Sequence, residues 1–111
     1  HAVYHVVVAL LGVADRFLAE ELKQLCERML VESLDEETVC WMLEAAEAYN
    51  APRLKRVGKE FFTHSKDLTL RVCHSEAFTT LRESAPHLAR ELDFLCSKNQ
   101  MTPPGYLMRA R

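Results

Sequence analysis

An internal repeat is the feature that most limits how this chain can fold. The segment ADRFLAEELKQLCERML at 14–30 aligns without gaps on AEAYNAPRLKRVGKEFF at 46–62, an offset of 32 residues. The matched pairs are Ala14 and Ala46, Phe17 and Tyr49, Ala19 and Ala51, Leu22 and Leu54, and Lys23 and Lys55. A period in the thirties is typical of stacked helical hairpins, although the motif residues of the tetratricopeptide class are missing here. The repeat therefore predicts one helical hairpin used twice, and it says nothing of function.

The segment 33–62 shows what such a hairpin contains. Apolar residues recur at helical spacing in both halves, at Val39, Met42, Leu43 and Ala46 and then at Leu54, Val57, Gly58, Phe61 and Phe62. Ser33 followed by Glu36 indicates a capping box, and Asn50 with Pro52 indicates a break between two helices. So short a link makes the two helices fold back on each other or cross steeply, and we expect Leu43 and Phe61 to be buried.

The first helix of this segment has apolar residues on two sides. Trp41, Ala45 and Ala48 form a strip beside the core stripe, so the helix is expected to pack on both sides. The residues left for water are Glu36, Glu37, Cys40, Glu44 and Glu47. The second helix is instead backed by basic residues, which are Arg53, Lys55, Arg56 and Lys59.

The rest of the chain also reads as helix. We predict an all-α fold of stacked antiparallel helical hairpins with about six helices, and we interpret 99–111 as a flexible tail. The β-branched run at 6–8 could be a strand, but the helical pattern continues through it. The expected helices are 1–17, 18–30, the two halves of 33–62, a short one at 68–73, another at 76–81, and a last one capped by Ser84. Their buried stripes are Val3, Val6, Val7, Leu10, Leu11, Ala14 and Phe17; Leu22, Leu25, Cys26, Met29 and Leu30; Ala77, Phe78 and Leu81; and Leu88, Leu92, Leu95 and Cys96.

Composition narrows the class of protein. With 111 residues the chain can form one domain with a core, and 14 basic against 16 acidic residues leave no overall basic field for nucleic acid or membrane. The four cysteines are unevenly spaced without a C-x-x-C, which favours free thiols and an intracellular location, cytoplasmic or nuclear. The apolar run at 6–11 is too short for a membrane span and lacks the flanks of a signal peptide. Because the chain opens inside an apolar run without Met, we interpret it as a piece of a longer protein.

Residues 10–30, LLGVADRFLAEELKQLCERML, resemble the last helices of a BTB/POZ domain. The resemblance rests on Ala14-Asp15-Arg16-Phe17 and on Leu22-Lys23-Gln24-Leu25-Cys26-Glu27. The next stretch, 33–62, resembles the three-box that opens a BACK domain, through Leu34, Ala48-Tyr49, Asn50-Ala51 and Leu54-Lys55. The resemblance covers about residues 2–97. It implies BTB helices at 1–31, a BACK domain at 33–98 and the tail after it.

The same resemblance implies a role as an adaptor. In that family BTB and three-box bind the N-terminal region of cullin-3, while another domain holds the substrate protein for ubiquitination. The β-sheet, the dimerisation helix and the hydrophobic-x-Glu motif of a whole BTB domain are absent from this sequence. We therefore expect the three-box half of the cullin site, a possible homodimer, and no enzymatic activity. The expected partner-binding residues are Leu34, Trp41, Ala45, Ala48 and Tyr49.

Particular residues bear on catalysis, metal binding and nucleic-acid binding. No phosphate loop or catalytic set is visible, His64, His74 and His87 have no metal-ligand spacing, and we expect no cofactor and no metal. The alternative is a helix-turn-helix nucleic-acid binder that uses the basic helix 51–62. The acidic helix beside it argues against that alternative, since it would repel phosphate. Trp41 either packs inside the domain or, with Ala45 and Ala48, meets a partner; in the second case the strip is open or buried against another chain.

Overall fold

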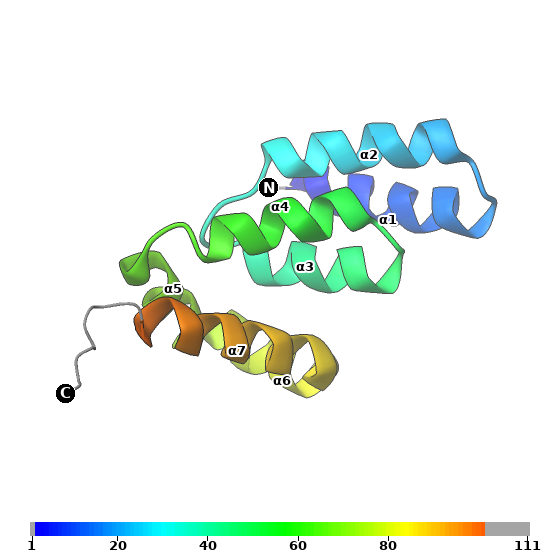
Figure 1. The fold of residues 1–111 in the computed structure, drawn as a ribbon. Coiled ribbons are helices and arrows are strands. Elements are labelled where there is room, and N and C mark those ends of the chain that lie inside the picture. The colour runs from blue at the N-terminus through cyan, green and yellow to red at the C-terminus, as the bar shows by residue number, and fades with distance from the viewer. Residues whose placement is uncertain (1, 102–111) are drawn as a thin grey trace.

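The computed structural model describes residues 2–101, and side-chain exposure is defined for 4–98. In this part of the chain there are seven helices and no strand, so the all-α prediction is confirmed and the number of helices is close to the about six expected (Figure 1). The helices are α1 (Ala2–Arg16), α2 (Glu20–Glu32), α3 (Val39–Ala48), α4 (Pro52–Phe62), α5 (Lys66–Cys73), α6 (Glu76–Ser84) and α7 (Pro86–Met101). The β-branched run at 6–8 lies inside α1. Helix α7 continues three residues into the expected tail, and residues 102–111 lie outside the described part.

The helices form a stack of antiparallel hairpins. Figure 1 shows α1 beside α2 and α3 beside α4 as two neighbouring hairpins, with α5, α6 and α7 at the far end. Of the two geometries left open for the segment 33–62, the structure has the folded-back one, because α3 and α4 run antiparallel along their length.

The two hairpins turn in the same way, which confirms the repeat at the level of the backbone. Leu18 has φ 57° and Asn50 has φ 55°, and these are the only non-glycine residues with positive φ in the described chain. The N–H of Ala19 donates to the carbonyl of Ala14 at 2.9 Å, and the N–H of Ala51 donates to that of Ala46 at 3.0 Å. Each partner lies 32 residues from its counterpart, so the repeat in sequence is a repeat in structure. Asparagine tolerates this left-handed conformation, whereas leucine is strained in it.

Helix α3 lies between two apolar cores and contributes to both. Its Met42, Ala45 and Ala46 pack into a first core with residues of α1, α2 and α4. Its Val39, Cys40 and Leu43 pack into a second core with Phe62 and with residues of α5, α6 and α7. Gly58 of α4 makes room for this contact, because a Cβ there would lie 2.8 Å from Cδ2 of Leu43. The wide apolar arc predicted for this helix is therefore explained by two cores inside one chain.

A buried carboxylate joins the two hairpins. Glu27 of α2 is 6% exposed, and its Oε2 accepts the N–H of Leu54 at 2.8 Å. Helix α4 begins at Pro52, and its N-cap residue Ala51 offers no side-chain acceptor. Glu27 thus takes the place of an N-cap side chain from a different helix and puts a negative charge at the positive end of α4.

The predicted capping box at Ser33 is wrong, and another box lies two residues later. The Ser33 hydroxyl donates back to the Met29 carbonyl at 3.2 Å and therefore closes α2. Asp35 and Thr38 form the reciprocal pair that precedes α3, since the Thr38 N–H donates to Asp35 Oδ1 at 2.9 Å and the Asp35 N–H donates to the Thr38 hydroxyl at 3.0 Å. Ser84 is likewise no cap of the last helix, because it ends α6 and its hydroxyl donates to the Thr80 carbonyl.

Several predicted burials are also wrong. Leu43 is buried as expected, but the fully buried aromatic residue of α4 is Phe62, and Phe61 is half-buried. Cys40 is buried in the second core instead of facing water, and Ala77 is exposed. The largest difference concerns α1 and α2, where part of each predicted stripe faces solvent. These exposed residues are Val6, Leu10, Phe17, Leu25 and Met29.

Candidate protein-interaction surface

The structure divides the five predicted partner-binding residues between two hollows. Leu34 lines a cavity of about 390 Å³, called here the Leu34 pocket. Trp41, Ala45, Ala48 and Tyr49 all line a shallower cavity of about 180 Å³, called here the Trp41 pocket. Four of the five residues are thus brought together on one side of α3. The assignment of these residues to a partner remains a prediction.

The Leu34 pocket has an apolar floor and an acidic rim. It lies between the first turns of α1, the end of α2 and the loop before α3. The apolar residues of its lining are Tyr4, Val7, Met29, Leu30 and Leu34. Its acidic residues are Glu32, Asp35 and Glu37, which are all exposed. A hollow of this kind suits an apolar side chain with basic neighbours.

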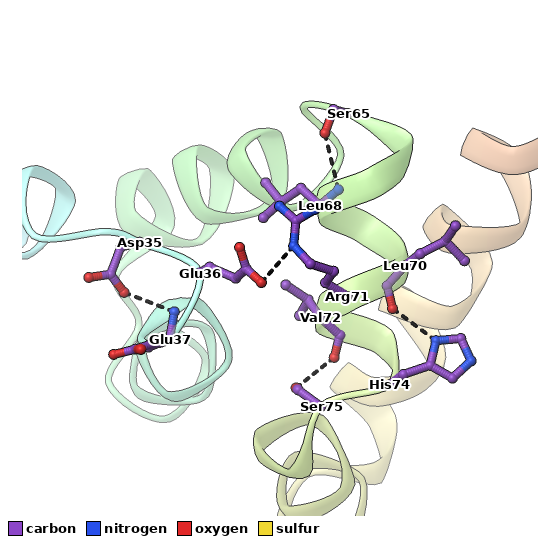
Figure 2. Close-up of polar contacts among 10 residues, drawn as sticks. All are labelled: Asp35, Glu36, Glu37, Ser65, Leu68, Leu70, Arg71, Val72, His74 and Ser75. Atoms are coloured by element: carbon purple, nitrogen blue, oxygen red, sulfur yellow. Dashed lines mark hydrogen bonds and ion pairs between the residues drawn. The ribbon is translucent and has the colours of Figure 1, made fainter.

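The acidic loop at the rim is fixed by its own hydrogen bonds and by α5. Oδ1 of Asp35 accepts the N–H of Glu37 at 2.9 Å, as it does that of Thr38. Nε of Arg71 donates to Oε2 of Glu36 at 2.8 Å, so the loop also contacts α5, as Figure 2 shows. Both partners are about half exposed, so this pair contributes little energy. The rim of the Leu34 pocket is therefore in place before any partner arrives.

The Trp41 pocket lies between α1 and α3, beside a cluster of aromatic rings. The Trp41 ring centroid is 5.2 Å from that of Tyr4 and 4.6 Å from that of His5. Tyr49 lies against Gly12, where a Cβ would be 3.0 Å from Cζ of the tyrosine ring. Trp41 is therefore half-buried by packing within the domain and still lines the cavity, while Ala48 is exposed and Ala45 is buried. Because Tyr4 lines the Leu34 pocket and touches Trp41, the rings stand between the two hollows.

The basic side of α4 is largely used inside the chain. Lys55 pairs with Glu47 at 2.6 Å, Lys59 pairs with Glu91 of α7 at 2.7 Å, and Arg56 lies 4.0 Å from Glu60. Within the described residues only Arg53 of this helix has no ion-pair partner. The antiparallel α3–α4 hairpin also differs from the steep crossing of a helix-turn-helix. The arrangement therefore offers little for the nucleic-acid alternative.

All four cysteines are free thiols, as the spacing predicted. Burial and then the nearby Glu44 raise the pKa of Cys40 to about 11. Burial and then the neighbouring Cys96 thiol raise the pKa of Cys73 to about 12. High pKa values keep both thiols protonated, so neither is an activated nucleophile. Among the described residues no group of three or more His, Cys, Asp or Glu side chains could hold a metal ion.

Sequence reasoning missed an apolar surface on the outside of α1 and α2. Its signal was present, because residues 2–14 contain no Asp, Glu, Lys or Arg, and a helix without charge is normally covered on every side. It also missed a hollow of about 590 Å³ between α4 and α7, lined by Lys59, Glu91 and the exposed Phe94. That hollow depends on how distant helices pack, so no local sequence pattern predicts it.

No helix within residues 2–101 is both long enough and apolar enough to cross a membrane.

Comparison with known proteins gives matches to parts of longer chains, among them the following three. The chain is 35% identical over 83 residues to BTB/POZ and MATH domain-containing protein 4 of Arabidopsis thaliana, and 39% identical over 83 residues to protein 3 of that name in the same plant. These matches cover 75% of this chain but 17% and 20% of the relatives. Protein maternal effect lethal 26 of Caenorhabditis elegans is 44% identical over 48 residues, 43% of this chain and 12% of that protein.

These matches decide how far the resemblance extends. No family model matches the chain, and no solved structure matches it. The matched segment makes up a fifth or less of each relative, so the activity and partners of a whole protein do not follow from it. The names of the relatives nevertheless agree with the BTB/POZ resemblance of the sequence. The chain is thus related in sequence to the BTB/POZ-containing proteins.

Proposed function

We propose that this chain is a protein-interaction module of a BTB–BACK substrate adaptor for a cullin-3 ubiquitin ligase. In this proposal 1–31 are the last BTB helices and 33–98 the BACK domain, and the adaptor works inside the cell. The Leu34 pocket and the Trp41 pocket take up the N-terminal region of cullin-3, and another domain of the parent protein holds the substrate. The relation to BTB/POZ-containing proteins supports the adaptor class.

The observation that carries the proposal is the Leu34 pocket. The pocket is a cavity of about 390 Å³ with an apolar floor and an acidic rim. Such a cavity can bind a chain segment that buries an apolar side chain and carries basic residues beside it. Asp35 in the loop that carries the rim accepts hydrogen bonds from the N–H groups of Glu37 and Thr38, which reduces the ordering needed on binding. The aromatic rings between the two pockets add the rigid apolar surface typical of interface centres.

Calorimetric titration of the chain with the cullin-3 N-terminal region tests the proposal. Glu37→Lys reverses a charge on the rim, and Ala48→Arg fills the mouth of the Trp41 pocket; both positions are exposed, so both variants are expected to fold. We expect each to weaken binding at least about tenfold.

The chain offers a matched control for each variant. Glu83→Lys and Ala77→Arg place the same changes at exposed positions of α6, away from both pockets, and should bind as the unchanged chain does. If the unchanged chain does not bind, or if all four variants bind equally, the proposal is wrong. Circular dichroism of each variant checks that its helices remain.

A further inference from the structure

Ser33 lies in the loop between α2 and α3, at the head of a run of acidic residues. The loop comprises residues 33–38, since α2 ends at Glu32 and α3 begins at Val39. The sequence of its first part is Ser33-Leu34-Asp35-Glu36-Glu37. Ser33 closes α2 and forms no capping box with Glu36, so capping does not account for an acidic residue three positions after this serine.

The serine and the carboxylates around it are accessible from solvent. The exposed residues are Glu32, Ser33, Asp35, Glu36 and Glu37, and the next hydroxyl residue, Thr38, is buried. The hydroxyl of Ser33 donates to the carbonyl of Met29 at 3.2 Å, which is long for a hydrogen bond between two oxygens. Releasing this exposed hydroxyl for a reaction therefore costs little.

No other serine or threonine of the described chain combines these features. In residues 2–101 only one further hydroxyl residue, Thr80, is followed by an acidic residue at the third position, Glu83. Thr80 lies inside α6, and the basic Arg82 stands between the two. A hydroxyl in a loop is more accessible to an enzyme than one within a helix.

The charges around Ser33 match a protein kinase that binds carboxylates on the C-terminal side of its target. Kinases select substrates by charge pattern, and like charges exclude the wrong ones. Carboxylates stand at the second, third and fourth positions after Ser33, and residues 29–52 contain no Lys or Arg. In the reaction the oxygen of Ser33 attacks the γ-phosphorus of ATP, its proton passes to the base of the kinase, and the bond from that phosphorus to ADP breaks.

We propose that Ser33 is a phosphorylation site for a kinase that recognises acidic residues, and that its phosphate opens the end of α2. A phosphoserine carries about −1.5 to −2 charges at pH 7 and has lost the hydroxyl donor. On Ser33 it lies beside the carbonyl of Met29, at the negative end of the α2 dipole, and next to Glu32 and Asp35 in the chain. These interactions are repulsive, so the last turn of α2 loosens.

The end of α2 is also a wall of the Leu34 pocket. Met29, Leu30, Glu32 and Ser33 all line that pocket. The carbonyl of Ser33 also accepts the hydroxyl of Thr38 at 3.2 Å. Phosphorylation therefore changes the wall of the pocket together with the start of α3. The modification site does not rest on the proposed function, whereas a regulatory effect on the partner of the pocket does.

Phosphorylation of the 111-residue chain with ATP and casein kinase II, a kinase of this class, tests the site. Mass spectrometry should find one phosphate, on Ser33, and none in Ser33→Ala. Glu36→Gln removes the carboxylate at the third position and should slow incorporation at least about tenfold. Arg71→Gln is the matched control, because it breaks the same ion pair but keeps the carboxylate; its rate should stay within about twofold of wild type.

Amide hydrogen exchange of the phosphorylated chain tests the opening of α2. The N–H groups of Ser33 and Leu34 donate to the carbonyls of Leu30 and Val31. Both should exchange at least about tenfold faster after phosphorylation, and phosphatase treatment should restore the original rates. The N–H of Ala89, which donates to the carbonyl of Ala85 in the last hairpin, should exchange as before.

The possible results are distinguishable. A chain that takes up no phosphate, a phosphate on another residue such as Thr80, or equal rates for Glu36→Gln and wild type overturns the proposed site. Unchanged exchange at Ser33 and Leu34 in the phosphorylated chain overturns the proposed opening. Circular dichroism checks that each variant keeps its helices. Neither measurement contains cullin-3, so a failure of the proposed function is detected separately, in the calorimetric titration.

Discussion

Removing the carboxylate of Glu27 should lower the free energy of unfolding, because this group joins the first hairpin to the second. Its Oε2 lies 2.8 Å from the N–H of Leu54, the third residue of α4, and that helix has no cap of its own. In Glu27→Ala the buried N–H loses its acceptor, which costs about 1–3 kcal/mol, and the helix loses a charged cap, worth about 0.5–2 kcal/mol. We therefore expect a loss of about 2–4 kcal/mol, a large part of the stability of a domain this size.

Urea unfolding followed by circular dichroism, in dilute solution, measures this loss. Glu27→Gln keeps an oxygen that can accept the bond but removes the charge, so its expected cost is about 1 kcal/mol. Gln24→Ala is the control on the same helix, since Gln24 is exposed and should change stability by no more than about 0.5 kcal/mol. A Glu27→Ala variant within about 0.5 kcal/mol of wild type would refute the capping role, and so would equal losses for alanine and glutamine.

Three further predictions concern strain, packing and charge. Leu18→Asn should stabilise the chain by about 0.5–1 kcal/mol in dilute solution, and Asn50→Leu should destabilise it by a similar amount, because both turns need a residue that tolerates the left-handed conformation. Equal unfolding midpoints for the two variants and the wild type would contradict this. Phe62→Ala should cost about 3–5 kcal/mol and Phe61→Ala clearly less, since Phe62 is fully buried; a reversed order in chemical unfolding would disprove it. The hydrogen bond from Lys59 lowers the pKa of Glu91. The stability that this ion pair contributes is therefore complete above about pH 4.5 and is lost as the pH falls through the lowered pKa. Glu91→Gln should flatten the acid side of the plot of stability against pH, and an unchanged plot would count against the pair.

The helices and the repeat could be predicted from the sequence because both depend on local pattern. The 32-residue offset predicted the hairpins correctly, and the two left-handed turn residues also lie at equivalent positions. The start of α3 was missed because Ser33 with Glu36 and Asp35 with Thr38 are both plausible capping pairs. Which pair forms depends on where α2 ends, and α2 extends to Glu32, so Ser33 closes it.

Burial could be predicted only where one side of a helix is apolar. Phe61 and Phe62 both suit the stripe of α4, and the choice depends on α5, α6 and α7, which pack over Phe62. Cys40 was assigned to water because glutamates surround it in the sequence, yet it lies against the second core. The Trp41 pocket could be predicted in part, since four of the five predicted partner-binding residues line it. The acidic rim of the Leu34 pocket could not be predicted, because part of it is formed by a loop.

The repeat also explains why α1 was harder to read than α3. Each is apolar on two sides, and the pattern of each predicts contacts on both. For α3 both contacts are inside the chain, since its Met42 side meets the first hairpin and its Leu43 side meets the second core. For α1 one side meets α2 and α3, while Leu10 and Val13 on the other side stay 40% and 46% exposed. A helix that repeats the sequence features of a buried one therefore predicts a neighbour on its open side, even where the described chain supplies none.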